Sequence, residues 1–448
     1  MKKSYKVSII MPSLNVAEYI DECIHSALNQ TLFERELICI DAGSTDGTWK
    51  KLLFYANHPK YKEDIRLLRC NIKSYGYQVN LGIHTAVGEY IAILETDDYV
   101  EANMYEELYN IGISNNADYI KADYDTFITY SSGKRVFDHV SLFRDSKEQY
   151  GKVINPGKNI YLYAHDHSIW KGIYKREFLL NYNIQFNESK GAAFQDIGFT
   201  QQVLSCAKKV VYINQSFYRY RKDRGDASIK SIHGLKYSYE EFLRLLKTDN
   251  LNKKIICIDG LFVHMVLSFE CELIKTLRGV EYNADSEIIK PYYVWFKKQI
   301  IYAISSKLLT IDLYQECPNL RLILENLYEF SLKLKKEDST LKRNRKELLQ
   351  TAIGKNIIVF GSGNYGGSII KYLYEYNINI HAICDSNRAL WGTKKYDLFI
   401  HSPAECVKKF AGDIYVIASK KYSKEMKKQL LDLGIEKNHI YIYSTGIV

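Results

Sequence analysis

The sequence lacks the cysteine patterns of a metal-binding or disulfide-stapled protein. Its nine cysteines are odd in number and scattered, and no two of them form a C-x-x-C pair. A zinc ribbon or a disulfide framework needs paired, closely spaced cysteines. We therefore expect reduced thiols in a cytosolic protein. Proline is also scarce, at 6 residues in 448, and no low-complexity linker separates parts of the chain.

Long hydrophobic runs and nucleic-acid motifs are absent as well. The most apolar long segment, residues 255–274, is interrupted by Asp259, Glu270 and Glu272, which is typical of a buried helix rather than a membrane span. Residues 1–6 are not followed by a signal-peptide core. We expect a cytoplasmic protein, with peripheral contact at the inner face of the plasma membrane as an extension. The net charge of +9 fits phosphate-rich ligands or an anionic membrane. Since no zinc-finger, RNA-binding or helix-turn-helix signature is present, we expect no nucleic-acid partner.

The sequence does contain a repeated alternation of short apolar runs and helical patterns. A chain of 448 residues is expected to form roughly two or three domains. Apolar runs at 7–11, 36–40, 65–68 and 90–94 alternate with helical spacing. Strands that alternate with helices predict an α/β fold with a mostly parallel sheet covered on both faces.

Acidic residues follow two of these predicted strands. The run at 90–94 ends on Glu95, Asp97 and Asp98, and the run at 36–40 ends on Asp41. Three carboxylates at the end of a buried strand repel one another unless a cation lies among them, and a hard divalent cation prefers such oxygen ligands. The carboxyl ends of strands are also where open α/β sheets bind ligands. The alternative is an acidic turn that faces water; for Asp41 it is a turn-forming acid.

The next part of the chain carries a second acid and a cluster of cations. We expect a strand at 118–122, a hairpin and loops over 123–157, and a turn and helix over 168–180 with Trp170 and Phe178 on one face. Asp196 precedes an apolar helical pattern, so it is either a functional acid or a helix N-cap. Residues 217–231 hold a dense polar set that includes Arg219, Arg221, Lys222, Arg224 and Ser228.

Long helical patterns with little glycine or proline fill residues 235–350. We interpret them as a helical spacer or interaction region. Residues 333–346 contain seven basic and two acidic residues, which indicate either a solvated helix face or a contact with a membrane surface.

The last hundred residues return to the α/β pattern. A strand at 356–360 leads into G-S-G-N-Y-G, with Gly361, Gly363 and Gly366, and a strand at 378–384 ends on Asp385. This glycine spacing, with an acid about 20 residues later, is the dinucleotide-binding fingerprint in its expected context. A domain of this size either binds a nucleotide or nucleotide-sugar or keeps the fold without a ligand. We predict domains at 1–234, 235–350 and 351–448.

Several motifs together resemble one family. They are V-S-I-I-M-P-S-L-N near the start, D-A-G-S-T-D-G-T, N-L-G-I-H-T-A-V-G-E-Y-I, E-T-D-D, S-I-W-K-G-I-Y-K-R-E-F-L and Q-D-I-G-F. In this order they resemble the family 2 glycosyltransferases, which have the nucleotide-sugar-binding fold called GT-A. The resemblance covers residues 7 to about 231 and implies a transferase of bacterial capsule or other surface polysaccharide.

The resemblance also implies roles for residues. Asp41, with Pro12 and Lys73 beside the base and Ser44 in the same loop, would bind a UDP-sugar donor. Glu95, Asp97 and Asp98 would bind Mn²⁺ or Mg²⁺, with Glu95 at a position where Asp is usual. Asp196 would be the general base, and Gln195 replaces the Glu that usually precedes it. The residues expected to close over the diphosphate are Arg221, Lys222 and Ser228.

The chemistry of these residue types agrees with that assignment. A divalent ion beside Asp97, helped by cations, offsets the charge of a leaving diphosphate. A single base, Asp196, suffices for one displacement and predicts inversion at the anomeric carbon. We expect a glycan or lipid-linked acceptor; the sequence does not give the oligomeric state. Two rivals remain: a non-catalytic scaffold that binds a nucleotide-sugar or glycan, and a bifunctional enzyme with an NAD-dependent C-terminal domain.

Overall fold

The computed structural model describes residues 4–130, 133–144, 146–224, 232–247, 258–306, 314, 317–419 and 421–443. Within these residues the chain forms two compact units. The first contains residues up to Thr126 together with His139–Leu327, and the second contains Phe127–Asp138 together with the residues from Tyr328 onward. None of the helices in these ranges combines the length and the apolar character needed to cross a membrane.

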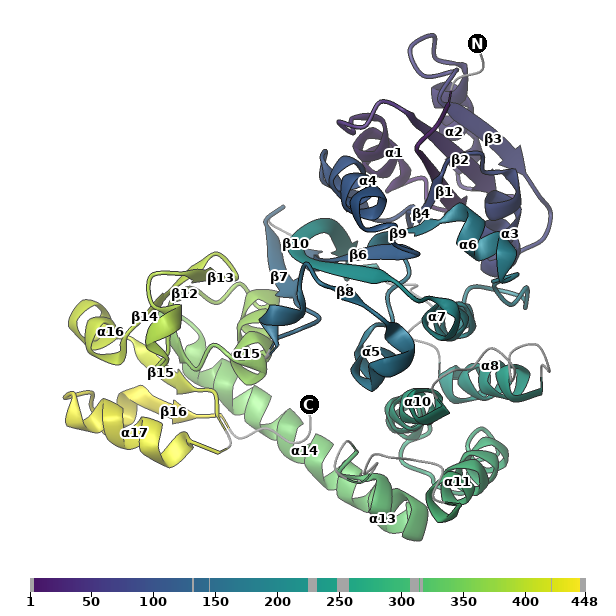
Figure 1. Cartoon of the computed structure of the whole chain (residues 1–448). Coiled ribbons are helices and arrows are strands. Elements are labelled where there is room, and N and C mark those ends of the chain that lie inside the picture. The colour runs from purple at the N-terminus through teal and green to yellow at the C-terminus, as the bar shows by residue number, and fades with distance from the viewer. Residues whose placement is uncertain are drawn as a thin grey trace. The chain divides into compact units, whose positions relative to one another are not determined.

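The first sheet runs in the order β3-β2-β1-β4-β9-β6-β10-β5, with β7 beside β6 and β8 beside β10 (Figure 1). Its strands are β1 (Val7–Ser13), β2 (Arg35–Asp41), β3 (Ile65–Arg69), β4 (Tyr90–Ile93), β5 (Tyr99–Val100), β6 (Tyr119–Thr129), β7 (Arg135–Val140), β8 (Val153–Ile154), β9 (Gly172–Lys175) and β10 (Val210–Arg221). The α/β class with a mainly parallel sheet is therefore confirmed.

Strands β1 to β4 form the parallel half of this sheet. Val7 of β1 is in register with Arg35 of β2 and with Tyr90 of β4, and β2 pairs in parallel with β3. Every residue of β1, β2 and β4 is buried, because helices cover both faces. The connecting helices are α1 (Ile20–Leu28), α2 (Thr48–Asn57) and α3 (Tyr75–Thr85). The parallel pairing brings the carboxyl ends of β1, β2 and β4 to one edge of the sheet.

The other half contains antiparallel pairs and corrects one prediction. We expected a turn and helix over 168–180, but Gly172–Lys175 is strand β9, antiparallel to both β4 and β6, and only Arg176–Asn181 is helical (α6). The helical spacing of apolar residues was misleading because both faces of β9 are covered. Gly172 is needed at the contact: a Cβ there would lie 2.1 Å from the backbone oxygen of Ile120.

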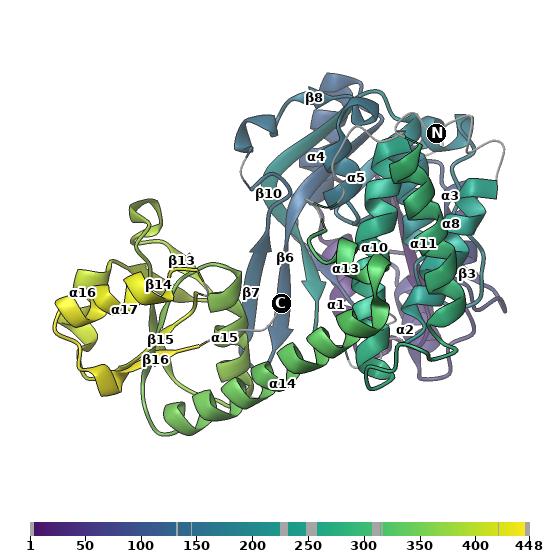
Figure 2. The ribbon, with the colours of Figure 1, turned by 90° about the horizontal axis from the view of Figure 1, so that it is seen from below.

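Helices complete the first unit. They are α4 (Met104–Asn115), α5 (Ile160–His165), α7 (Gln195–Cys206), α8 (Gly234–Lys247), α10 (Ile258–Gly279), α11 (Lys290–Ser305) and α13 (Leu320–Glu325). Helix α10 packs against α5, α8 and α11, as Figure 2 also shows. The helical patterns predicted between residues 235 and 325 thus belong to the same unit as the first sheet. The three-part domain division stays a prediction.

The second unit is built on a smaller sheet in the order β13-β14-β12-β11-β15-β16. Its elements are α14 (Leu327–Ala352), β11 (Ile357–Phe360), α15 (Asn364–Glu375), β12 (Ile380–Cys384), β13 (Lys394–Lys395), β14 (Leu398–His401), α16 (Pro403–Phe410), β15 (Ile414–Ile417), α17 (Ser423–Asp432) and β16 (Ile440–Ile442). Apart from β13, the paired strands are parallel. The central order β14-β12-β11-β15-β16 is that of doubly wound nucleotide-binding folds.

Candidate active site

A cavity of about 600 Å³ opens in the first unit where β1 and β4 end. Its lining comes from six stretches of the chain that are far apart in sequence. The lining residues are Pro12, Ser13, Leu14, Val16, Lys73, Ser74, Tyr75, Gln78, Glu95, Thr96, Asp97, Ile169, Trp170, Lys190, Gly191, Ala192, Phe194, Asp196, Tyr220 and Arg224. The structure therefore brings together five residues predicted from the sequence: Pro12, Lys73, Glu95, Asp97 and Asp196.

The acidic turn after β4 is fixed to β1 by hydrogen bonds. The Leu94 N–H donates to the Ile10 carbonyl at 2.9 Å, and the Thr96 hydroxyl donates to the Pro12 carbonyl at 2.8 Å. The Asp98 N–H donates to the Glu95 carbonyl at 3.1 Å, which closes the turn. These bonds direct the Glu95 and Asp97 side chains into the cavity.

Glu95 accepts a hydrogen bond of 2.6 Å from the Tyr75 hydroxyl. The pKa of Glu95 is raised to about 8, first by burial and then by the nearby carboxylates of Asp97 and Asp196, while the Tyr75 hydrogen bond acts in the opposite direction. Before a cation arrives, this carboxyl group is therefore neutral over much of the physiological range.

Asp97 keeps an exposed part of its carboxylate, with a side-chain exposure of 22%. One oxygen lies 3.1 Å from the Arg224 guanidinium, and the backbone carbonyl of Asp97 accepts a 2.8 Å bond from Arg221 Nε. Asp97 is thus a negative group on the cavity wall that already has a cation as its partner.

Asp98 does not line the cavity. It is buried, and its two oxygens accept hydrogen bonds from the Tyr218 hydroxyl at 2.8 Å and from the Arg221 N–H at 2.7 Å. Burial, together with the charge of Asp97, raises its pKa well above the ordinary value. Over the residues that the structure describes, no three His, Cys, Asp or Glu side chains converge on one metal position.

Asp196 lies in the first turn of α7 and also lines the cavity. The preceding Phe194 has a left-handed backbone (φ 63°), a conformation that is strained for a bulky residue and occurs at functional sites. One Asp196 oxygen accepts a 3.1 Å bond from the Ile197 N–H. Burial raises the pKa of Asp196 to about 6, and the charge of Glu241 adds to this shift. A carboxylate with that pKa is ionised at neutral pH and still basic enough to take a proton.

Gln195 anchors this turn to its surroundings. Its amide oxygen accepts a 2.7 Å bond from the Gly76 N–H at the start of α3, and its amide nitrogen donates to the Ser189 carbonyl at 2.6 Å. A glutamate at this position has no N–H to donate to a carbonyl. The replacement of the usual Glu therefore matches the local hydrogen bonding.

The predicted Asp41 and Ser44 do not line the cavity. Asp41 is fully buried at the end of β2, where it accepts bonds from the Gly43 and Ser44 N–H groups and pairs with Arg69 at 3.4 Å. The Ser44 hydroxyl accepts a 2.9 Å bond from the Asn15 N–H. Their donor-binding roles stay predictions.

The predicted diphosphate loop is placed only in part. The Arg221 guanidinium lies over the ring of Tyr19 and pairs with Glu22 at 2.9 Å, so it holds the turn from outside the cavity. Lys222 does not line the cavity either. Ser228 lies outside the described residues. Arg224, from the same polar set, lines the cavity and carries its positive charge there.

Many of the cavity residues were not predicted from the sequence, among them Tyr75, Phe194 and Tyr220. Trp170 stacks on Tyr220 with an interplanar angle of 4° and a centroid distance of 5.1 Å, which forms an aromatic wall. Tyr75 begins α3 and Tyr220 lies in β10, and a single tyrosine in a helix or strand gives no sequence signal of its own for a site. Phe194 could have been considered from the sequence, because it directly precedes a predicted helix that holds the predicted base Asp196.

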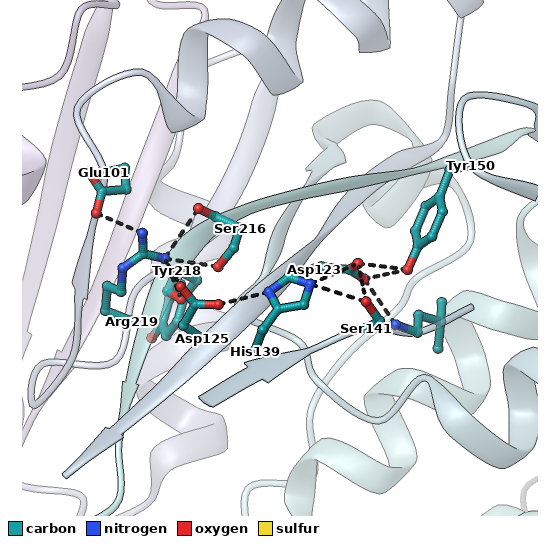
Figure 3. Close-up of polar contacts among 10 residues, drawn as sticks. Glu101, Asp123, Asp125, His139, Ser141, Tyr150, Ser216, Tyr218 and Arg219 are labelled. Carbon is teal, nitrogen blue, oxygen red and sulfur yellow. Dashed lines mark hydrogen bonds and ion pairs between the residues drawn. The ribbon is translucent and has the colours of Figure 1, made fainter. Parts of the chain in front are cut away.

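A ladder of alternating charges lies on β6, β7 and β10 and at Glu101, which follows β5 (Figure 3). Arg219 pairs with Glu101 at 2.9 Å and with Asp125 at 3.1 Å. His139 lies between Asp125 and Asp123, and its hydrogen bonds to them, first that to Asp123, raise its pKa to about 9. His139 is therefore protonated at neutral pH, and the ladder alternates in sign along its length.

The glycine motif of the second unit has the geometry of its fingerprint. Gly361 has φ 113°, Gly363 has open space where a Cβ would stand, and a Cβ on Gly366 would lie 1.8 Å from the Gly361 oxygen. Asp385 accepts bonds from the Ser362 N–H at 2.8 Å and the Ser362 hydroxyl at 2.6 Å. The acid thus binds the glycine turn itself, and its role toward a nucleotide stays a prediction.

Family models match two parts of the chain. The model described as Glycosyl transferase family 2 matches residues 8–192. The model described as C2185-like, N-terminal, matches residues 353–441.

Individual proteins are also similar to this chain. The cholesterol galactosyltransferase of Borreliella burgdorferi is 27% identical over 331 residues, which are 70% of this chain and 86% of that protein. The poly(ribitol-phosphate) beta-N-acetylglucosaminyltransferase TarP of Staphylococcus aureus is 35% identical over 123 residues, 27% of this chain and 36% of that protein. The crystal structure of S. aureus TarS 1-349 in complex with UDP-GlcNAc has a TM-score of 0.51 at 17% identity, and covers 75% of this chain and 91% of that one. That likeness shows the fold.

Proposed function

The N-terminal part of this chain belongs to glycosyl transferase family 2, and we propose that it moves a sugar from a UDP-sugar to an acceptor hydroxyl with inversion at the anomeric carbon. The chain is a glycosyltransferase, and its relatives include a bacterial cholesterol galactosyltransferase and a bacterial poly(ribitol-phosphate) beta-N-acetylglucosaminyltransferase. The donor, the metal dependence, the stereochemistry and the acceptor are the parts that we propose.

One observation carries the proposal: a single cavity is lined by the carboxylates of Asp97 and Asp196 and by the cations of Lys73 and Arg224. Transfer between a diphosphate and a hydroxyl needs positive charge at the leaving group and a base at the nucleophile. Both kinds of group lie in a space of about 600 Å³, which is within the size range of small-molecule sites.

The residues of the acidic turn fit a divalent cation that is shared with the donor. Mg²⁺ and Mn²⁺ prefer oxygen ligands, and Mg²⁺ is usually held by one or two carboxylates plus substrate phosphates rather than by a full protein cage. Asp97 supplies a partly exposed carboxylate, and Glu95 supplies a second one that ionises readily beside a cation. When bound, the ion would offset the charge of the diphosphate.

Lys73 and Arg224 have the same electrostatic task. Both line the cavity, and charge-assisted bonds from such groups to phosphate oxygens are stronger than neutral ones. A donor diphosphate would take over Arg224 from Asp97, which would leave the Asp97 carboxylate for the cation. Arg221 supports this region from outside the cavity.

Asp196 is the proposed proton acceptor. As the acceptor oxygen bonds to the anomeric carbon, its proton passes to the Asp196 carboxylate, and the bond from that carbon to the diphosphate oxygen breaks. The nucleoside diphosphate leaves with the electron pair. Because one displacement on one face of the sugar suffices, the configuration at the anomeric carbon inverts.

We propose a glycan or lipid-linked saccharide as the acceptor. The names of the relatives support a glycan or lipid hydroxyl as the receiving group. The aromatic wall of Trp170 and Tyr220 gives the cavity an apolar side that suits the apolar face of a sugar ring.

Binding of UDP-, GDP-, CDP- and dTDP-sugars, each with and without Mn²⁺, tests the donor side by calorimetry and thermal shift. We expect one UDP-sugar to bind in a metal-dependent way, and Asp97→Ala to abolish that dependence. Asp285→Ala, an exposed acid of the same unit, is the matched control and should bind as the unmodified protein does. Donor binding that ignores both metal and Asp97 would overturn the metal assignment.

A further inference from the structure

Helix α14 (Leu327–Ala352) presents two faces of opposite character. It runs for 26 residues without a break, as Figure 1 shows. Phe330, Leu334, Leu348 and Ala352 are buried on its inner face. This face accounts for the stability of the helix, so its outer face is free to serve another purpose.

The outer face is cationic along most of its length. With 3.6 residues per turn, positions 335, 336, 342, 343 and 346 lie within one third of the helix circumference. They are Lys335, Lys336, Lys342, Arg343 and Lys346, and all are exposed. The acidic residues of α14 lie outside that arc: Glu329 and Glu347 flank it, and Glu337 and Asp338 lie toward the inner face.

These cations are not neutralised within the part of the chain that the structure describes. Lys335, Lys336, Lys342 and Lys346 make no ion pair there, and Arg343 has only a 4.0 Å pair with Glu347 in which both side chains are well exposed. Exposed pairs of that length contribute little. The five side chains therefore present to solvent a positively charged surface with almost no acidic partners.

Two large apolar side chains share this face one and two turns before the cations. Tyr328 is 63% exposed and Leu332 is 49% exposed. Aromatic and aliphatic side chains beside a row of lysines are typical of helices that lie at a membrane surface, where the apolar groups enter the headgroup layer. A soluble polyanion, such as a nucleic acid, provides no such apolar layer.

We propose that this outer face, from Tyr328 to Lys346, docks the protein on an anionic lipid bilayer. Positions 328–346 span about 27 Å in a straight line, so the cations reach one planar surface together. A cluster of four to eight basic residues on one helix is sufficient for binding to anionic lipids. The proposal does not depend on the transfer reaction.

Vesicle sedimentation with the full chain tests the proposal. The vesicles are phosphatidylcholine alone and phosphatidylcholine in which about one lipid in three is phosphatidylglycerol. The test variant is Lys335→Glu/Lys342→Glu/Lys346→Glu. The matched control, Lys408→Glu/Lys424→Glu/Lys428→Glu, changes the net charge equally on exposed positions of α16 and α17.

We expect binding to the anionic vesicles only, lost at high salt because exposed charges are screened. The test variant should lose affinity by at least about a hundredfold, since each basic residue near the surface contributes roughly fivefold. The control should lose much less. Circular dichroism verifies that the variants are folded. If the Lys→Glu test variant unfolds, the milder triple Lys→Gln variant at the same positions replaces it, with a smaller expected loss of affinity for the vesicles.

Three results would overturn the proposal. The first is that the unmodified protein does not bind anionic vesicles at low salt. The second is that the test and control variants lose the same affinity, which assigns binding to the overall charge. The third is that soluble heparin binds more tightly than vesicles and that the test variant no longer binds heparin, which makes the face a polyanion site.

Discussion

Replacing Asp196 by asparagine removes the proposed proton acceptor and keeps the size of the side chain. An amide cannot take the proton of the acceptor hydroxyl. General-base catalysis contributes about 10² to 10⁴ in rate, which corresponds to roughly 3–5 kcal/mol of activation free energy. We therefore expect kcat to fall by that factor. The affinity for the donor should change much less, because the proposed donor contacts are made by Lys73, Asp97 and Arg224 rather than by Asp196.

The pH profile identifies the group more closely. Since burial raises the pKa of Asp196 to about 6, kcat/KM of the unmodified enzyme should rise as the pH increases through about 6 and level off above it. Glu241→Gln removes a negative charge that contributes to this raised pKa, so the rise should move to lower pH. A merely structural role of Asp196 predicts no such movement.

The Asp196→Asn substitution should also stabilise the fold above about pH 6. A carboxylate whose pKa is raised on folding favours the folded state only below its unfolded pKa, and this contribution is lost as the pH rises through about 6. The rise in the pKa of Asp196 corresponds to about 3 kcal/mol in the free energy of unfolding. This figure is an upper limit, because the carboxylate opens to the cavity. We expect Asp196→Asn to raise the free energy of unfolding by about 1–3 kcal/mol at pH 8 and by almost nothing at pH 4.

Steady-state measurement of UDP release in the presence of acceptor, and urea unfolding at both pH values, provide the readouts. Asp285→Asn is the control for loss of an acid, and it should change neither quantity. If Asp196→Asn keeps kcat within threefold of the unmodified enzyme at pH 8, the base assignment is refuted, and a structural role in the first turn of α7 becomes the better explanation.

Two further predictions concern stability. The pKa of His139 is raised to about 9 by its hydrogen bonds to Asp123 and Asp125. The protonated imidazole therefore stabilises the fold fully at a pH below the ordinary histidine pKa, and this contribution disappears as the pH rises through about 9. Because the side chain is 48% exposed, we expect His139→Ala to cost about 1 kcal/mol at pH 6 and little at pH 10 by urea unfolding; equal losses at both pH values would contradict the ionic explanation. Gly172→Ala should cost more than about 3 kcal/mol or prevent folding, because the Cβ would meet the Ile120 backbone, whereas Gly412→Ala, which meets nothing, should stay within about 1 kcal/mol. Thermal unfolding compares the two, and similar melting temperatures would contradict the packing argument.

The sequence predicted the parts of the fold that depend on local pattern. The apolar runs that became β1, β2 and β4 are buried on both faces, and such runs are readable from sequence. Strand β9 was wrongly predicted as helix because its position between β4 and β6 is set by distant partners. Spacing along the chain carries no record of those partners.

The candidate site was predictable to a similar extent. Glu95 and Asp97 could be placed at a strand end, and that end lies at the cavity. The orientation of Asp98 could not be foreseen, because it depends on the Tyr218 hydroxyl more than a hundred residues later. Arg224 as the partner of Asp97 is likewise a product of tertiary structure, since β10 returns to the acidic turn only in the folded chain.

The second unit is built from two separate segments of the chain, and this affects how such proteins can exchange parts during evolution. Its core includes Val136 from the β6–β7 hairpin beside Leu348 and Ile369, and Asp138 of the hairpin pairs with Lys371 at 2.7 Å. The unit is thus discontinuous in the gene. A recombination event that transfers only the segment from Tyr328 onward would carry an incomplete core, and the recipient would have to supply a matching hairpin. The two parts of this chain are therefore expected to be inherited together, and exchange of the second unit between proteins requires that two separate segments move at once.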